Sequence, residues 1–115
     1  PYGPVLGARI PDGASAATLP PPEVLRTLGL TDGCGFDVEG NLWVTLVTAG
    51  KIVAIRPDGE VVTMLEDPSG AIVNHPTNVT WGGADMRDLY IGSIAVDYVL
   101  HARSPVPGLR MAHQR

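Results

Sequence analysis

Short apolar runs, separated by Gly, Pro, Asn and Asp, recur along the whole chain. Each run has the length and the Val, Ile and Leu content of a β-strand, and the intervening residues are those that favour turns. The pattern predicts nine strands and no long helix. The predicted strands cover residues 5–10, 23–28, 33–38, 42–46, 51–56, 61–65, 78–81, 89–94 and 98–102.

One turn sequence occurs twice. Residues 10–13 read IPDG and residues 56–59 read RPDG, an offset of 46 residues, and each copy follows an apolar run. Proline at the second position and glycine at the fourth fit a tight turn between antiparallel strands. Each copy therefore predicts a hairpin.

A second pattern repeats at nearly the same distance. Residues 36–44 read FDVEGNLWV and residues 79–91 read VTWGGADMRDLYI, which places LWV 47 residues before LYI. Repeats of 40–50 residues that contain only short strands and turns are typical of β-propeller blades, each a four-stranded sheet. Periodicity alone leaves an ordinary meander or sandwich as an alternative. Two patterns that repeat in step favour blades.

The blade interpretation divides the chain into four parts. Residues 1–30 form the end of one blade, residues 31–67 a complete blade, residues 76–104 most of the next, and residues 105–115 an extended or disordered tail. The total is about two and a half blades, which cannot close a ring and leave strand edges unpaired. We therefore expect either the C-terminal part of a longer propeller or several copies that assemble into one.

Composition limits the class of protein. The 14 glycines and 11 prolines among 115 residues fit a chain with many turns, and 44% hydrophobic against 17% charged residues fit a folded core. A net charge of −4 argues against nucleic acid as a partner. The single cysteine, Cys34, excludes an internal disulfide. No run is long enough to span a membrane and no signal-peptide pattern is visible, so we expect a cytoplasmic protein with no membrane partner.

Several motifs in order resemble one known family. Residues 31–44 read TDGCGFDVEGNLWV, residues 50–59 read GKIVAIRPDG, residues 76–83 read PTNVTWGG and residues 88–91 read DLYI. This series is similar to the signature of the senescence marker protein/gluconolactonase/luciferin-regenerating-enzyme-like family, and the similarity covers residues 31–94 well. Thr31 stands where the family usually has proline.

The resemblance implies a fold, a cofactor and an activity. Members are six-bladed β-propellers that hold one divalent metal ion, often calcium or zinc, in the central channel, and they are similar to lactonases that open sugar lactones. The family pattern places a metal-binding aspartate at the position of Asp32. The family's other metal ligands, and the arginine and asparagine that contact substrate, fall in segments without a counterpart in this chain.

Asp32 is the principal candidate site residue. The resemblance implies that it binds the metal and acts in catalysis, and a carboxylate there suits calcium and is acceptable to zinc. From the residues alone, an aspartate before a glycine also fits a turn that bonds its own backbone. Asn78 lies 46 residues further on, at the same place in the next blade. Its amide is a candidate substrate-binding group, with a structural bond to a loop as the alternative.

Other polar and aromatic residues receive structural interpretations. We expect Asp37 to accept hydrogen bonds from turn amides. The side chains of Trp43, Trp81 and Tyr90 are expected to pack between blades. Cys34 is expected to be a small buried side chain, and His75 to be a solvated loop histidine.

The sequence thus predicts a metal-dependent hydrolase that opens sugar lactones, with a metal-activated water that attacks the lactone carbonyl. Two alternatives remain open. One is a non-catalytic propeller fragment or binding module. The other is a related propeller phosphotriesterase, which the same metal chemistry permits. The expected partners are a small lactone, and either the missing blades or further copies of the chain.

Overall fold

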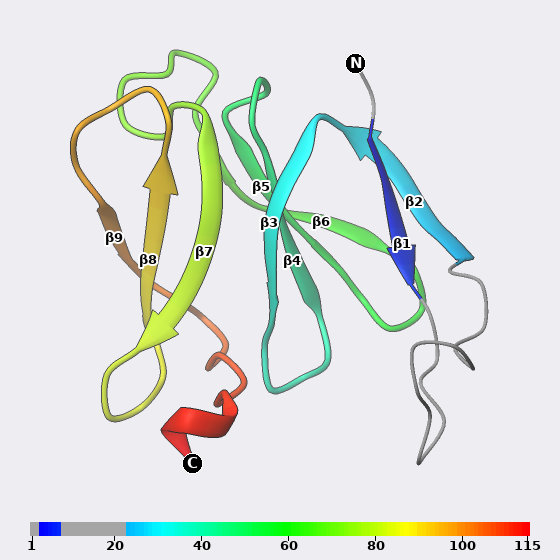
Figure 1. Ribbon diagram of the computed structural model, residues 1–115, viewed down its shortest axis with the longest axis vertical. Helices are drawn as coiled ribbons and strands as arrows, with labels where there is room; N and C mark the ends of the chain where they lie inside the picture. The colour runs from blue at the N-terminus through cyan, green and yellow to red at the C-terminus, as the bar shows by residue number, and fades with distance from the viewer. Residues whose placement is uncertain (1–2, 8–22) are drawn as a thin grey trace.

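Nine antiparallel strands form three sheets in the computed structural model, which describes residues 3–7 and 23–115 (Figure 1). The first sheet pairs β1 with β2, the second has the order β3-β4-β5-β6, and the third has the order β7-β8-β9. The strands are β1 (Gly3–Gly7), β2 (Glu23–Gly29), β3 (Thr31–Phe36), β4 (Leu42–Leu46), β5 (Lys51–Ile55), β6 (Val61–Glu66), β7 (Pro76–Gly82), β8 (Asp88–Ser93) and β9 (Leu100–Arg103).

The predicted all-β class is confirmed, and most strands lie within two residues of their predicted positions. The hairpin at the second PDG copy is present. Arg56 N–H donates to the Glu60 carbonyl at 2.8 Å, and Gly59 has φ of 90°, a conformation that favours glycine. The first PDG copy, at residues 11–13, lies outside the described residues. No helix in residues 3–7 and 23–115 is long and apolar enough to cross a membrane.

The two central strands of the second sheet, β4 and β5, are buried on both faces and therefore lack the alternation of a half-exposed strand. One face packs against the third sheet through a cluster that includes Trp43, Ile52, Trp81 and Leu89. The opposite face carries a second cluster of four residues, Val44, Leu46, Val53 and Ile55, against which Val5 of β1 packs. The three sheets therefore stack through their faces.

Two of the three predicted inter-sheet aromatic residues meet as expected. The rings of Trp43 and Trp81 pack edge to face, with centroids 5.2 Å apart. Tyr90 does not take part in this contact, and its inter-blade role stays a prediction. Its side chain is 40% exposed and lies against His101, because it alternates with the buried Leu89 and Ile91 and faces away from the second sheet.

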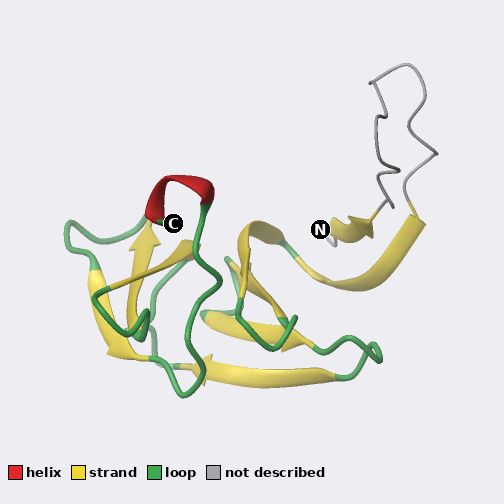
Figure 2. Ribbon diagram, turned by 90° about the horizontal axis from the view of Figure 1, so that it is seen from below, coloured by secondary structure: helices red, strands yellow, loops and turns green. Residues whose placement is uncertain are grey.

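The chain after β9, expected to be extended or disordered, is held against both larger sheets by backbone hydrogen bonds. The Pro107 carbonyl accepts a hydrogen bond from Val38 N–H, and Leu109 N–H donates to the Phe36 carbonyl. Gly108 N–H donates to the Met86 carbonyl, so the same segment also bonds to the turn between β7 and β8. A short 3-10 helix, Ala112–Gln114, follows, drawn red in Figure 2. Backbone bonds to two different turns fix the tail, and composition does not reveal such pairing.

Candidate functional site

The first strands of the two larger sheets, β3 and β7, lie side by side (Figure 1). Gly33 lies against Thr77 and Asn78, and Gly35 lies against Val79 and Trp81, so the two strands run in the same direction. A methyl group on Gly33 would lie 2.5 Å from the Asn78 Oδ1 atom. Glycine is required here because the backbones of β3 and β7 approach so closely.

This contact brings the two predicted site residues to neighbouring positions. Asp32 precedes Gly33 on β3, and both Asp32 and Asn78 are exposed. Within the described residues, no hydrogen bond or ion pair engages the Asp32 carboxylate or the Asn78 amide. Both side chains therefore present oxygen atoms to solvent at one end of the β3–β7 pair.

A bulge in β3 sets the position of Asp32. Thr31 pairs with Leu46, and Cys34 pairs with Val44, so Asp32 and Gly33 together lie opposite Thr45. Bulges of this two-against-one kind redirect side chains and are frequent beside active sites. The buried Thr45 hydroxyl donates to the Gly33 carbonyl at 3.1 Å. Thr45 was not among the predicted residues, and the signal for it was a polar residue within the apolar LWVTL strand.

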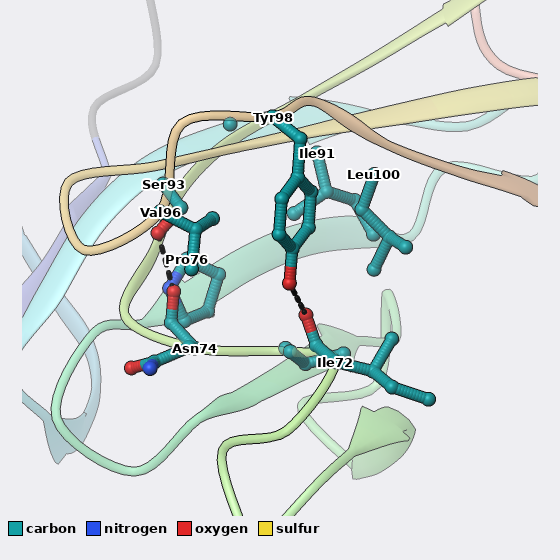
Figure 3. Close-up of a pocket in the computed structure, with 10 residues that line it drawn as sticks. Ile72, Asn74, Pro76, Ile91, Ser93, Val96, Tyr98 and Leu100 are labelled. Atoms are coloured by element: carbon teal, nitrogen blue, oxygen red, sulfur yellow. Dashed lines mark hydrogen bonds between the residues drawn. The ribbon is translucent and has the colours of Figure 1, made fainter.

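The loop that leads into β7 is held by two side chains, one from β8 and one from the loop that follows β8. Figure 3 shows Ser93 and Tyr98 reaching this loop, where the Ser93 hydroxyl donates to the Asn74 carbonyl at 2.5 Å and the Tyr98 hydroxyl donates to the Ile72 carbonyl at 3.1 Å. The cavity beside them has a volume of about 10 Å³, room for about one water molecule. It is a packing feature of the loop, and too small for an organic ligand.

Asp67 organises the same loop from its other end. Its carboxylate accepts hydrogen bonds from the Ser69 hydroxyl at 2.6 Å and from the backbone N–H groups of Ile72 and Val73. These bonds stabilise the charged form and lower the pKa of Asp67 to about 2, with the Ser69 hydroxyl as the largest cause. The ordered loop therefore fixes where β7 begins, at Pro76, and with it the position of Asn78.

The remaining candidates take other roles. Asp37 is buried and accepts hydrogen bonds from turn amides and from Trp43 Nε1, so its structural interpretation is confirmed. Cys34 is exposed, and the prediction of a buried thiol is wrong because residues 32, 34 and 36 alternate onto the open face of β3. His75 is half-buried, has φ of 45°, and places Nδ1 2.5 Å from Asn74 Oδ1.

A cluster of charged side chains lies at the opposite end of the third sheet. Arg103 contacts Asp85 at 2.6 Å and Asp88 at 2.9 Å, and His101 lies 3.0 Å from Asp88. Hydrogen bonds from Arg103 lower the pKa of Asp85, and bonds from His101 and Arg103 lower that of Asp88. Asp88 pairs with Gly82 at the end of β7, whereas Asn78 lies near its beginning. These groups are therefore not part of the candidate site.

The candidate site offers oxygen atoms of the kind that bind a hard cation such as calcium. A carboxylate oxygen such as those of Asp32 is the kind of ligand that calcium prefers, and it also binds zinc. In the part of the chain that the structure describes, no three His, Cys, Asp or Glu side chains come together as metal ligands. The Asp32 carboxylate fits a divalent cation as one contributing ligand, with further donors required, and Asn78 lies at the neighbouring position as a candidate group for substrate.

Comparisons with known proteins identify the family of the chain. The family model described as SMP-30/Gluconolactonase/LRE-like region matches residues 9–95. The 6-deoxy-6-sulfogluconolactonase of Pseudomonas putida is 37% identical over 65 residues, which are 56% of this chain and 21% of that protein. Regucalcin of Danio rerio is 35% identical over 83 residues, which are 70% of this chain and 27% of that protein. The chain thus spans about a fifth to a quarter of the curated relatives it matches.

A solved structure supports the fold. Luciferin-regenerating enzyme superposes with a TM-score of 0.64 at 24% sequence identity, over 83% of this chain and 38% of that one. At this identity the likeness concerns the fold alone. The stacked sheets are blades of a β-propeller, as the repeats predicted, and the chain contains part of that architecture. The chain belongs to the SMP-30/gluconolactonase/LRE-like family.

Proposed function

We propose that this chain forms part of a divalent-cation-dependent hydrolase that opens sugar lactones. The observation that carries the proposal is the contact between Gly33 and Asn78, which places the exposed Asp32 and the exposed Asn78 at neighbouring positions on the first strands of adjacent blades, where no described residue bonds to either side chain. Family membership supports the reaction class, and the name of the Pseudomonas putida relative supports a sugar lactone as substrate.

The proposed chemistry assigns two roles to Asp32 and one to Asn78. Asp32 holds the cation, calcium or zinc, and accepts a proton from the attacking water as the water oxygen bonds to the lactone carbonyl carbon. The ring C–O bond then breaks, and the proton passes to the released ring oxygen, so that one water is consumed. Asn78 orients a substrate hydroxyl through its amide. The cation, when bound, supplies a Lewis acid that polarises the carbonyl and lowers the pKa of water.

The proposed site draws its remaining ligands from further propeller strands. Asp32 alone supplies fewer donors than a calcium or zinc site uses. The further strands belong either to the same protein or to further copies of this chain. A cytoplasmic location, with neither nucleic acid nor membrane as partner, remains a prediction.

Parallel hydrolysis assays on gluconolactone and an aryl phosphotriester, with calcium or zinc added, test this function in the complete protein. We expect lactone hydrolysis that a chelator abolishes and that Asp32→Asn lowers roughly 100-fold or more. The matched control is Asp58→Asn, in the β5–β6 turn, which should retain the parental rate. Phosphotriester hydrolysis without lactone hydrolysis would support the phosphotriesterase alternative. No hydrolysis of either substrate would support a binding module.

A further inference from the structure

The bulge that carries Asp32 is held from two sides. On one side, β7 closes against Gly33, where a methyl group would meet the Thr77 carbonyl and the Asn78 side chain. On the other side lies Thr45, the single residue of β4 opposite the bulge, whose hydroxyl donates to the Gly33 carbonyl at 3.1 Å. The peptide next to Asp32 is therefore fixed by a backbone contact and by a hydrogen bond.

Packing alone does not require a hydroxyl at position 45. Thr45 is 0% exposed, pairs with Ile52 of β5, and lies on the same face of β4 as Trp43. Valine has the same shape and would suit these apolar neighbours, whereas a buried hydroxyl is stable only when hydrogen-bonded. Its acceptor is the Gly33 carbonyl, inside the bulge.

We propose that Thr45 is a positioning residue for the site. Its hydroxyl holds the bulge so that the Asp32 carboxylate is presented to the cation beside the Asn78 amide, which faces the substrate. This role rests on the proposed function, because it assigns Thr45 to the cation that Asp32 holds. Thr45 is distinct from the groups that contact substrate, and acts only through the backbone of residues 32 and 33.

The first test follows the bulge itself in the metal-free protein. Thr45→Val removes the donor and keeps the shape, so amide hydrogen exchange in residues 31–35 should become faster, while exchange in β5 stays as in the parent. Thr45→Ser, which keeps the hydroxyl, should restore slow exchange. Unchanged exchange in Thr45→Val would overturn the proposal.

The second test measures the affinity for calcium alone by titration. We expect Thr45→Val to bind calcium roughly tenfold more weakly, as is typical when a group that orients a metal ligand is removed, and Thr45→Ser to bind as the parent does. The control is Val53→Ala, a buried change on the opposite face of the sheet, which should lower the melting temperature and leave the calcium affinity unchanged. If Thr45→Val does not fold, Thr45→Ala carries the same test.

The outcomes separate the two proposals. Calcium affinity that Asp32→Asn lowers but Thr45→Val does not would overturn the positioning role and leave the proposed function intact. Calcium affinity that survives Asp32→Asn would overturn the proposed function, and the positioning role with it, even where the exchange data show that Thr45 holds the bulge.

Discussion

Two aspartates five residues apart show how surroundings assign a role. Asp32 is exposed on the open face of β3 and engages none of the described residues, whereas Asp37 is 2% exposed and accepts four hydrogen bonds. A carboxylate that already satisfies two turn amides, Asn41 and Trp43 Nε1 has no free lone pair to offer a ligand. Asp37 therefore belongs to the fold, and Asp32 is available for chemistry.

At this scale we predict that Asp37→Ala lowers the free energy of unfolding by about 2–4 kcal/mol, because it leaves the Trp43 indole N–H and the turn amides without acceptors. Urea unfolding of the protein measures the change. Asp58→Ala is the matched control, since Asp58 is an exposed turn aspartate that accepts one bond, from Glu60 N–H. Its effect should stay within about 1 kcal/mol. Equal losses in the two variants would show that the Asp37 network adds no stability.

The sequence was informative about residues that follow a local rule. The role of Asp37 followed from its turn, and the inter-blade role of Trp43 and Trp81 followed from their strands. It was misleading where the tertiary face decides, as for Cys34, because alternation gives two faces without saying which one a neighbouring blade covers. The role of Thr45 depends on a bulge, and the sequence pattern does not locate that bulge.

The loop between β6 and β7 is the element that determines where β7 begins. The Asp67 carboxylate bonds to it from the end that follows β6. Ser93 of β8 and Tyr98 of the next loop bond to its carbonyl groups. The predicted strand began at Asn78, two residues late, because the pairing of Pro76 with Ser93 is a long-range contact. A proline at that position argues locally against a strand.

This loop should loosen in acid. The pKa of Asp67 is lowered in the folded protein, so its contribution to stability is complete above the ordinary value of 3.8 and is lost as the pH falls through about 2. NMR of the Ile72 and Val73 amides should therefore report a transition near pH 2, which Asp67→Asn abolishes. A transition centred near 3.8 would show that the carboxylate does not hold these amides.

The tail is a second element whose packing depends on one small residue. Gly108 is buried against the Trp81 ring, and a methyl group there would collide with the ring and Cβ. We predict that Gly108→Ala costs about 1–3 kcal/mol of stability and exposes the Arg110 bond to trypsin, because the tail must move off Trp81. Limited proteolysis with mass spectrometry measures the rate of cleavage at Arg110.

The control for the tail is Gly29→Ala, whose added methyl would meet, among the described residues, Leu46 alone, at 3.9 Å. That variant should be cleaved at the parental rate. If Arg110 is cleaved as slowly in Gly108→Ala as in Gly29→Ala and the parent, the tail tolerates the extra methyl group. Its contact with Trp81 would then not be what holds the tail in place.

At the scale of the whole molecule, the repeats were the most reliable guide. Two motifs repeating every 46 to 47 residues predicted propeller blades, and the sheets and the family match agree. The site could be predicted only in part. The equal blade position of Asp32 and Asn78 follows from the repeat, but the close approach of β3 and β7 at Gly33 required the structure. The further ligands belong to other blades, so this sequence does not identify them.

The central claim is that Asp32 presents its carboxylate to a divalent cation. Calorimetric titration of the chelator-treated, complete protein with calcium, and separately with zinc, tests it most directly, with Asp32→Asn and the control Asp58→Asn measured beside the parent. The account predicts one specific site for at least one of the two ions in the parent and in Asp58→Asn, and its loss in Asp32→Asn. Parental affinity in Asp32→Asn, or no specific site in the parent, would contradict it.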